Sequence, residues 1–280
     1  MTERRHILSV VLGLIVCGVV CPVLLIGQAA GAAADPLGEK GSQVDRLLAR
    51  IATYDYGASR EPLTELTELE RALGQEPAAL RALEQKYIRF LESDASLAGK
   101  QFICRRLSIV GSEASAATLA RMLADPETAD MARYALEMIP GAAVDEALRR
   151  AIDSAEDKAK IGILSTLGLR GEPASVPVLA RHVTSPDPDV ASAAVTGLGQ
   201  IGNAAAIAAL REAKGKTSGD LRMMVLDAYL SCADKLEMSG QVEEARQIYR
   251  EVFESDVPTV IRSAALRGMV FCSEGQAGLI

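Results

Sequence analysis

The chain has 280 residues, of which 49% are hydrophobic and 24% are charged, and its formal net charge is −7. This acidic balance argues against nucleic-acid binding, which needs a basic face for the phosphates. Aromatic residues make up only 4% and tryptophan is absent. A single compact core of this length would usually contain more large aromatic side chains, whereas a repeat array needs none, because each repeat buries its face only against its neighbours.

The N-terminal segment, residues 1–34, is predicted to direct export. Arg4 and Arg5 precede an uncharged apolar run over residues 7–26, and the small residues that follow suit cleavage after Ala32 or Ala34. An apolar run of this length can also span a bilayer, so an uncleaved membrane anchor is the alternative. In both cases we expect the folded part in the periplasm or cell envelope, with membrane contact only through a retained N-terminal segment.

Residues 35–94 are predicted to form N-terminal capping helices. The first helix has apolar residues at the i, i+3, i+4, i+7 spacing of one buried face: Val44, Leu47, Leu48 and Ile51. Gly57 is expected to end it, and two further helices follow over 63–73 and 79–91. These helices share no regular period, which suits a cap over the open end of a repeat array.

The next part of the chain carries a period marked by four glycines, at spacings of 30, 30 and 31 residues: Gly111, Gly141, Gly171 and Gly202. Each glycine is followed, after seven or eight residues, by a leucine that we expect to face the core: Leu119, Leu148, Leu179 and Leu210. A helix pair repeated every 20–50 residues or so is typical of a stacked α-solenoid. We therefore predict four repeats over residues 95–214, in an all-α, right-handed α-solenoid of stacked antiparallel helix pairs.

Each repeat is expected to contain a leading helix before its glycine and a trailing helix after it. The predicted leading helices span 99–110, 129–139, 159–169 and 190–201. The predicted trailing helices span 112–124, 142–152, 173–183 and 204–213.

These repeats resemble HEAT repeats, in particular the short HEAT-like repeats first associated with phycobilisome lyases. The resemblance rests on residues 190–210, VASAAVTGLGQIGNAAAIAAL, and on residues 172–180, EPASVPVLA. Both look like the family's rhythm of alanine, leucine, glycine and isoleucine. The resemblance covers residues 95–214 and part of 257–280, and it implies an armadillo-like solenoid that presents a long binding surface.

The register changes after Gly215. Residues 233–249 resemble the middle of a tetratricopeptide hairpin, with matching small, packing and aromatic residues: Ala233, Leu236, Gly240, Ala245 and Tyr249. We therefore predict one such hairpin over 215–256 and the start of a further HEAT-like repeat over 257–280. The partner helix of that repeat would begin after Gly275, and the array is expected to continue beyond residue 280. The residues then left uncovered are Ile261, Leu266 and Val270.

No pattern indicates catalysis, a metal or a cofactor. Residues 197–202, GLGQIG, match the glycine spacing of dinucleotide sites, but a helical stretch precedes them where a strand is required. His182 is the single histidine after residue 34, so a histidine triad or cluster cannot form, and a structural role near a helix end is expected. Cys104, Cys232 and Cys272 are expected to be buried thiols, with one disulfide plus one free thiol as the alternative.

Arginine recurs near the end of each trailing helix, at Arg121, Arg150, Arg181 and Arg211. Stacking would align these residues as a row that binds carboxylates of a partner; alternatively, each arginine complements the dipole of its own helix. Tyr54 and Tyr56 are further candidate anchors, because tyrosine is favoured at interfaces; Tyr134 is either an anchor or a core residue.

These observations favour an exported scaffold that binds a protein partner through its repeat surface and has no catalysis or cofactor of its own. The alternative is an accessory domain of a larger exported enzyme whose catalytic part lies beyond residue 280. A lyase acting on a tetrapyrrole is suggested only by the name of the family that the repeats resemble.

Overall fold

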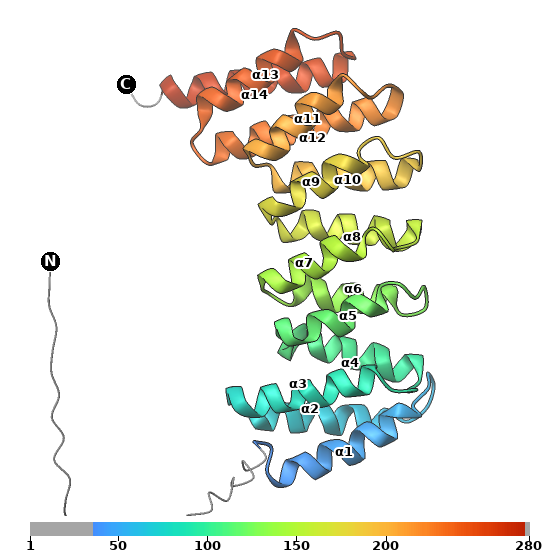
Figure 1. Ribbon diagram of the computed structural model, residues 1–280. Coiled ribbons are helices and arrows are strands. Elements are labelled where there is room, and N and C mark those ends of the chain that lie inside the picture. The colour runs from blue at the N-terminus through green and yellow to red at the C-terminus, as the bar shows by residue number, and fades with distance from the viewer. Residues whose placement is uncertain (1–35, 278–280) are drawn as a thin grey trace, which may run out of the picture. The chain divides into compact units, whose positions relative to one another are not determined.

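The computed structural model describes residues 36–277, and helices are the only regular secondary structure in this part of the chain (Figure 1). The predicted export segment lies outside the described residues. The α-helices are α1 (Glu39–Ala52), α2 (Glu61–Leu73), α3 (Pro77–Leu91), α4 (Leu97–Val110), α5 (Ala116–Met122), α6 (Ala129–Met138), α7 (Ala142–Ala151), α8 (Asp157–Arg170), α9 (Val176–His182), α10 (Pro188–Ile201), α11 (Ala204–Lys214), α12 (Gly219–Met238), α13 (Val242–Phe253) and α14 (Thr259–Ala277). Two 3-10 helices, η1 (Glu113–Ser115) and η2 (Pro173–Ser175), precede α5 and α9.

Consecutive helix pairs pack one on the next, which confirms the predicted α-solenoid. Among the leading helices, α4 packs on α6, α6 on α8, and α8 on α10; among the trailing helices, α5 packs on α7 and α9 on α11. The stack continues through α12, α13 and α14 (Figure 1). The four leucines that follow the periodic glycines are fully buried, as predicted: Leu119, Leu148, Leu179 and Leu210.

The four periodic glycines do not share one conformation. Gly171 and Gly202 adopt the left-handed conformation at the ends of α8 and α10, with φ of 70° and 62°, which glycine enters without the steric cost of a Cβ. Gly141 instead precedes α7 with φ of 121°. Gly111 follows α4 with φ of −71°, so its place in the period does not depend on left-handed geometry.

Glycines of the GLGQIG stretch serve close helix packing. A Cβ added at Gly168 of α8 would come within 2.5 Å of the Cα of Gly197 on α10, and one added at Gly199 would lie 3.1 Å from the Cβ of Ala228 on α12. The absence of side chains at these glycines thus allows α8, α10 and α12 to approach closely, and α10 is helical throughout this stretch.

Two of the predicted trailing helices begin differently from expectation. The predicted helices over 112–124 and 173–183 each start as a 3-10 turn before becoming α-helical at Ala116 and Val176. In the first, the Ser112 side chain accepts from the backbone N–H of Ala114; in the second, Pro173 occupies the first position of the turn, where its missing N–H is not needed.

The predicted end of the first helix is wrong. α1 ends at Ala52, and Gly57 lies in the following loop with φ of 91°. The chain leaves the helix early because Tyr54 packs partly buried against the core, and its carbonyl accepts a hydrogen bond from the Ser96 hydroxyl.

The predicted break after Gly275 is also wrong. α14 is one continuous helix from Thr259 to Ala277, and a single glycine inside a helix costs only about 1 kcal/mol relative to alanine. Ile261 was expected to be uncovered but is only 7% exposed, whereas Leu266 and Val270 are exposed as expected. Ile261 lies on the face of α14 that also lines the cleft between α10 and α12, while Leu266 and Val270 point away from the packed helices.

Candidate partner-binding surfaces

The structure places the four predicted arginines in the last turns of α5, α7, α9 and α11: Arg121, Arg150, Arg181 and Arg211. Arg121 and Arg150 line one groove between α5 and α7. Arg181 lines a second groove, between α9 and α11. Arg211 turns away toward α12 and α13. The predicted row is therefore divided among three environments.

Each of the four arginines has a carboxylate partner. Arg121 pairs with Glu92, which follows α3. Arg150 Nε lies 2.8 Å from Glu146 Oε1 within α7, and Arg181 Nη2 lies 3.6 Å from Asp153 Oδ1, which follows α7. The arginines keep unused N–H donors, since a guanidinium has five, but they do not form an unopposed positive strip.

Arg211 is the most strongly engaged member of the row. Its Nε donates to the hydroxyl of Tyr229 at 2.9 Å, and its guanidinium pairs with Glu251 of α13 at 3.1 Å. Tyr229 also donates to Glu251 at 2.8 Å. This network ties α11 to the helices that follow, so Arg211 has a clear role in packing.

The groove between α5 and α7 has a volume of about 750 Å³. Its floor consists of small side chains from both helices: Ala116, Ala117, Ala120, Ala124, Ala143, Ala147 and Ala151. Charged residues stand at its rim, with Glu113 and Glu146 beside Arg121 and Arg150. A smaller groove of about 250 Å³ between α9 and α11 has the same pattern. Ala180 and Ala209 lie on its floor, and Arg181 and Lys216 lie at its rim.

The two predicted tyrosine anchors lie in the loop between α1 and α2, away from the arginine-lined grooves. Tyr54 is half-buried against the core. Tyr56 is 67% exposed, and its hydroxyl donates to Gln101 of α4. Tyr134, on α6, is also exposed, at 48%.

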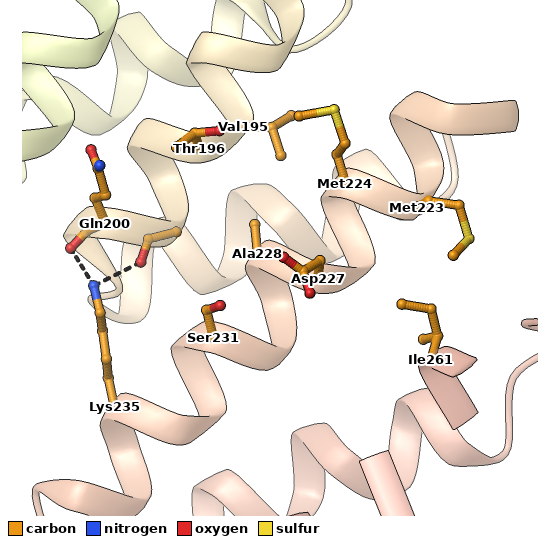
Figure 2. A pocket seen from close by; sticks show the side chains of 11 residues that line it. Val195, Thr196, Gln200, Met223, Met224, Asp227, Ala228, Ser231, Lys235 and Ile261 are labelled. Atoms are coloured by element: carbon orange, nitrogen blue, oxygen red, sulfur yellow. Dashed lines mark hydrogen bonds between the residues drawn. The ribbon is translucent and has the colours of Figure 1, made fainter. Parts of the chain in front are cut away.

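A cleft between α10 and α12, which the sequence pattern did not predict, has a volume of about 540 Å³ (Figure 2). Its walls consist of the apolar side chains of Val195, Met223, Met224 and Ala228. Ile261 of α14 closes one side. Polar side chains reach it from both helices: Thr196, Gln200, Asp227, Ser231 and Lys235. Two features of the sequence could have indicated this cleft: the change of register after Gly215 and the adjacent methionines Met223 and Met224. A change of register produces an irregular junction between helices, and such a junction leaves space that regular stacking fills.

Lys235 forms one end of this cleft (Figure 2). Its ammonium group donates to the carbonyl oxygens of Gly199 at 2.8 Å and Gln200 at 2.5 Å, in the last turn of α10. Carbonyls at a helix end lack intrahelical partners, and a cation there is favoured by the helix dipole. Lys235 is thus committed to joining α12 to α10.

The other reactive side chains occupy structural positions. Cys104, Cys232 and Cys272 are buried free thiols, as expected, and Nδ1 of His182 lies 2.8 Å from the carbonyl of Val178. Within residues 36–277, no three side chains of the metal-binding types lie together. In the same part of the chain, none of the helices combines the length and the apolar character needed to cross a membrane.

A family model described as HEAT repeats matches residues 144–231. The match begins in α7 and extends past Gly215 into α12, so it includes α10 and most of α12, the two helices of the cleft in Figure 2. No curated protein matches the chain.

Proposed function

The chain is a HEAT-repeat protein, and from this premise we propose that it is an exported scaffold that binds a protein partner in the groove between α5 and α7. HEAT repeats are commonly surfaces for protein interaction, and repeat arrays present extended binding faces. The proposal includes the absence of catalysis by the chain itself.

The observation that carries the proposal is the alanine floor of this groove. Ala117, Ala124 and Ala143 are exposed, and Ala120 and Ala147 are half-buried. Small side chains on neighbouring helices leave a depression in which the ridge of a third helix fits, as in ordinary helix packing. A groove of about 750 Å³ is large enough for several side chains of such a helix.

The rim of the groove favours a partner that carries charges of both signs. Arg121 and Arg150 lie near the C-terminal ends of α5 and α7, and Glu113 lies in η1, which precedes α5. Carboxylates of the partner would reach the free N–H groups of the arginines. Because both arginines are largely exposed, these pairs would mainly set orientation and association rate.

The test is photo-crosslinking in the native cell envelope. A photoreactive amino acid at position 147 should yield one specific adduct, whereas the same amino acid at Ala205, an exposed alanine of α11 outside the groove, should yield none. Filling the groove with Ala120→Leu should abolish the adduct, and Ala205→Leu should leave it unchanged.

The charge arrangement is tested separately with the double variant Arg121→Glu/Arg150→Glu. We expect it to weaken the interaction by about tenfold, equivalent to about 1.4 kcal/mol. Adducts that arise equally from positions 147 and 205, or that survive Ala120→Leu, would place the interface elsewhere on the solenoid.

Export is proposed from the N-terminal segment alone. Mass spectrometry of the chain isolated from its host would show a start after Ala32 or Ala34 if the segment is a cleaved signal peptide. An intact N-terminus in the membrane fraction would support the anchor, and an intact N-terminus in the cytoplasmic fraction would contradict export.

A second candidate function is an accessory repeat domain of a larger exported enzyme. The exposed Leu266 and Val270 of α14 favour it, because solenoid ends are usually covered by a further repeat, a cap or another domain. The parent reading frame decides between the two candidates: a catalytic domain encoded after residue 280 would support the second.

A further inference from the structure

The cleft between α10 and α12 (Figure 2) combines an apolar lining with a free negative charge. It shares no lining residue with the α5–α7 groove. Met223 and Met224 are half-buried, and Ile261 of α14 lines the cleft with them. Methionine side chains are flexible and polarizable, and they adapt to different apolar ligands. This lining suits an aliphatic side chain of a partner.

Asp227 supplies the negative charge. Its carboxylate is exposed at the edge of the cleft, and with the residues between 36 and 277 it forms neither an ion pair nor a hydrogen bond. It differs in this respect from Asp145, Glu84 and Glu251, which all have partners inside the fold.

The charges around Asp227 leave a negative excess. Asp227 also lines the adjoining cleft between α12 and α14, together with Asp234 and Glu237. The basic residues of the two clefts are Lys235 and Arg267. Three carboxylates thus face two cations, and the Lys235 ammonium donates to the end of α10 rather than to Asp227.

We propose that the cleft between α10 and α12 docks a polypeptide segment that places a lysine or arginine next to an aliphatic residue. The cation pairs with Asp227, and the aliphatic side chain enters between Met223, Met224 and Ile261. The hydroxyls of Thr196 and Ser231 form no hydrogen bond within the described residues and face the cleft, so they are available to the backbone of the segment.

The test uses a displayed library of random 12-residue peptides selected on the immobilised full-length chain. The recovered peptides should share a basic residue beside an aliphatic one. The dominant peptide is then synthesised with a fluorophore, and its affinity is measured by anisotropy for the unaltered chain and for four variants.

Two variants act on the cleft, and two are matched controls. Asp227→Asn should weaken binding by about fivefold, as expected for an exposed ion pair, and Thr196→Trp should block the cleft and abolish binding. Asp94→Asn removes another exposed carboxylate, and Thr64→Trp adds the same bulk to an exposed position of α2; both should leave binding unchanged. All four positions are exposed, so the variants should unfold at the same temperature as the unaltered chain.

A peptide in which the basic residue is replaced by norleucine completes a double-mutant cycle. It should bind about fivefold more weakly to the unaltered chain and should lose nothing further with Asp227→Asn. The proposal is overturned if the library yields no enriched peptide, if the peptides lack a basic residue, or if Thr196→Trp and Thr64→Trp bind the peptide equally.

Discussion

Arg170 of α8 binds Asp145 of α7, with 2.5 Å between Nε and Oδ1, and each of these side chains is only 10% exposed. The same guanidinium donates to the carbonyls of Leu136 at 2.8 Å and Ile139 at 2.6 Å, at the end of α6. One side chain thus joins three helices from two repeats, and it satisfies carbonyls that a helix end leaves without partners.

Replacing Arg170 with methionine should therefore lower the free energy of unfolding by about 3 kcal/mol, because Asp145 is left as a buried charge without its partner. Urea unfolding followed by circular dichroism would measure the change. The matched control is Arg150→Met, whose guanidinium is 78% exposed and pairs with Glu146; it should cost far less, because exposed ion pairs contribute little to stability. Equal losses in the two variants would show that Arg170 is not a structural link.

Glu84 makes a similar link between α3 and the following repeat. Its carboxylate is 1% exposed and accepts from the Ser112 N–H at 2.7 Å, the Ser112 hydroxyl at 2.8 Å and the Ser115 hydroxyl at 2.6 Å. Glu84→Gln should cost about 2 kcal/mol, since an amide has one acceptor oxygen and adds donors where only acceptors are needed. The exposed Glu127→Gln serves as the control, and a cycle with Ser112→Ala should reveal coupling above about 0.5 kcal/mol. Purely additive losses would argue against the hydrogen-bonded contact.

Gly168 allows α8 and α10 to approach closely. In Gly168→Ala the new Cβ would lie 2.5 Å from the Cα of Gly197, so the helices must move apart, at a cost of about 2 kcal/mol. Gly215→Ala is the control, because its Cβ would meet only the Glu212 carbonyl, at 3.7 Å; its stability should be unchanged or slightly higher. Thermal unfolding of both variants tests the difference, and a neutral Gly168→Ala would contradict the close packing.

The buried thiols should make the fold sensitive to alkali. Burial raises the pKa of Cys104 from 9.0 to about 12, with Lys100 opposing the shift, and burial raises the pKa of Cys232 to about 11. Below pH 9 both the folded and unfolded states keep these protons, so stability does not depend on them. Above pH 9 the unfolded state releases them first, and the free energy of unfolding falls as the pH rises toward the folded-state values.

Urea unfolding at pH 8 and pH 10 measures this loss. Cys104→Ala should reduce the difference between the two pH values by about 1 kcal/mol, whatever its own effect on stability at pH 8. An unchanged difference in this variant would indicate that Cys104 is not buried as a neutral thiol.

Much of the solenoid could be predicted from the sequence, because each repeat depends on contacts between close neighbours in the chain. The spacing of Gly111, Gly141, Gly171 and Gly202 locates the turns, and the leucines that follow them locate the core. Such local patterns locate the helices of the regular repeats, although α5 and α9 begin only after a 3-10 turn. They failed at Gly57 and Gly275, where the glycine itself does not decide where a helix ends.

The arrangement of the candidate surfaces could be predicted only in part. The period correctly placed four arginines in the last turns of the trailing helices, but it did not show that Arg211 turns toward Tyr229 and Glu251. That orientation depends on α12 and α13, which follow a different register. Whether the arginines bind a partner stays a prediction.

The sequence by itself determined the all-helical repeat architecture. The helix periodicity, the glycine spacing and the buried leucines are all patterns that extend over no more than about one repeat of the chain. Only the tertiary structure decided which side chains meet between repeats, such as Arg170 with Asp145 and Glu84 with Ser112, and which residues line one cleft, such as Met223 and Ile261. The physical reason is that these contacts depend on how one helix pair rotates and shifts on the next, and a local pattern does not specify that rotation.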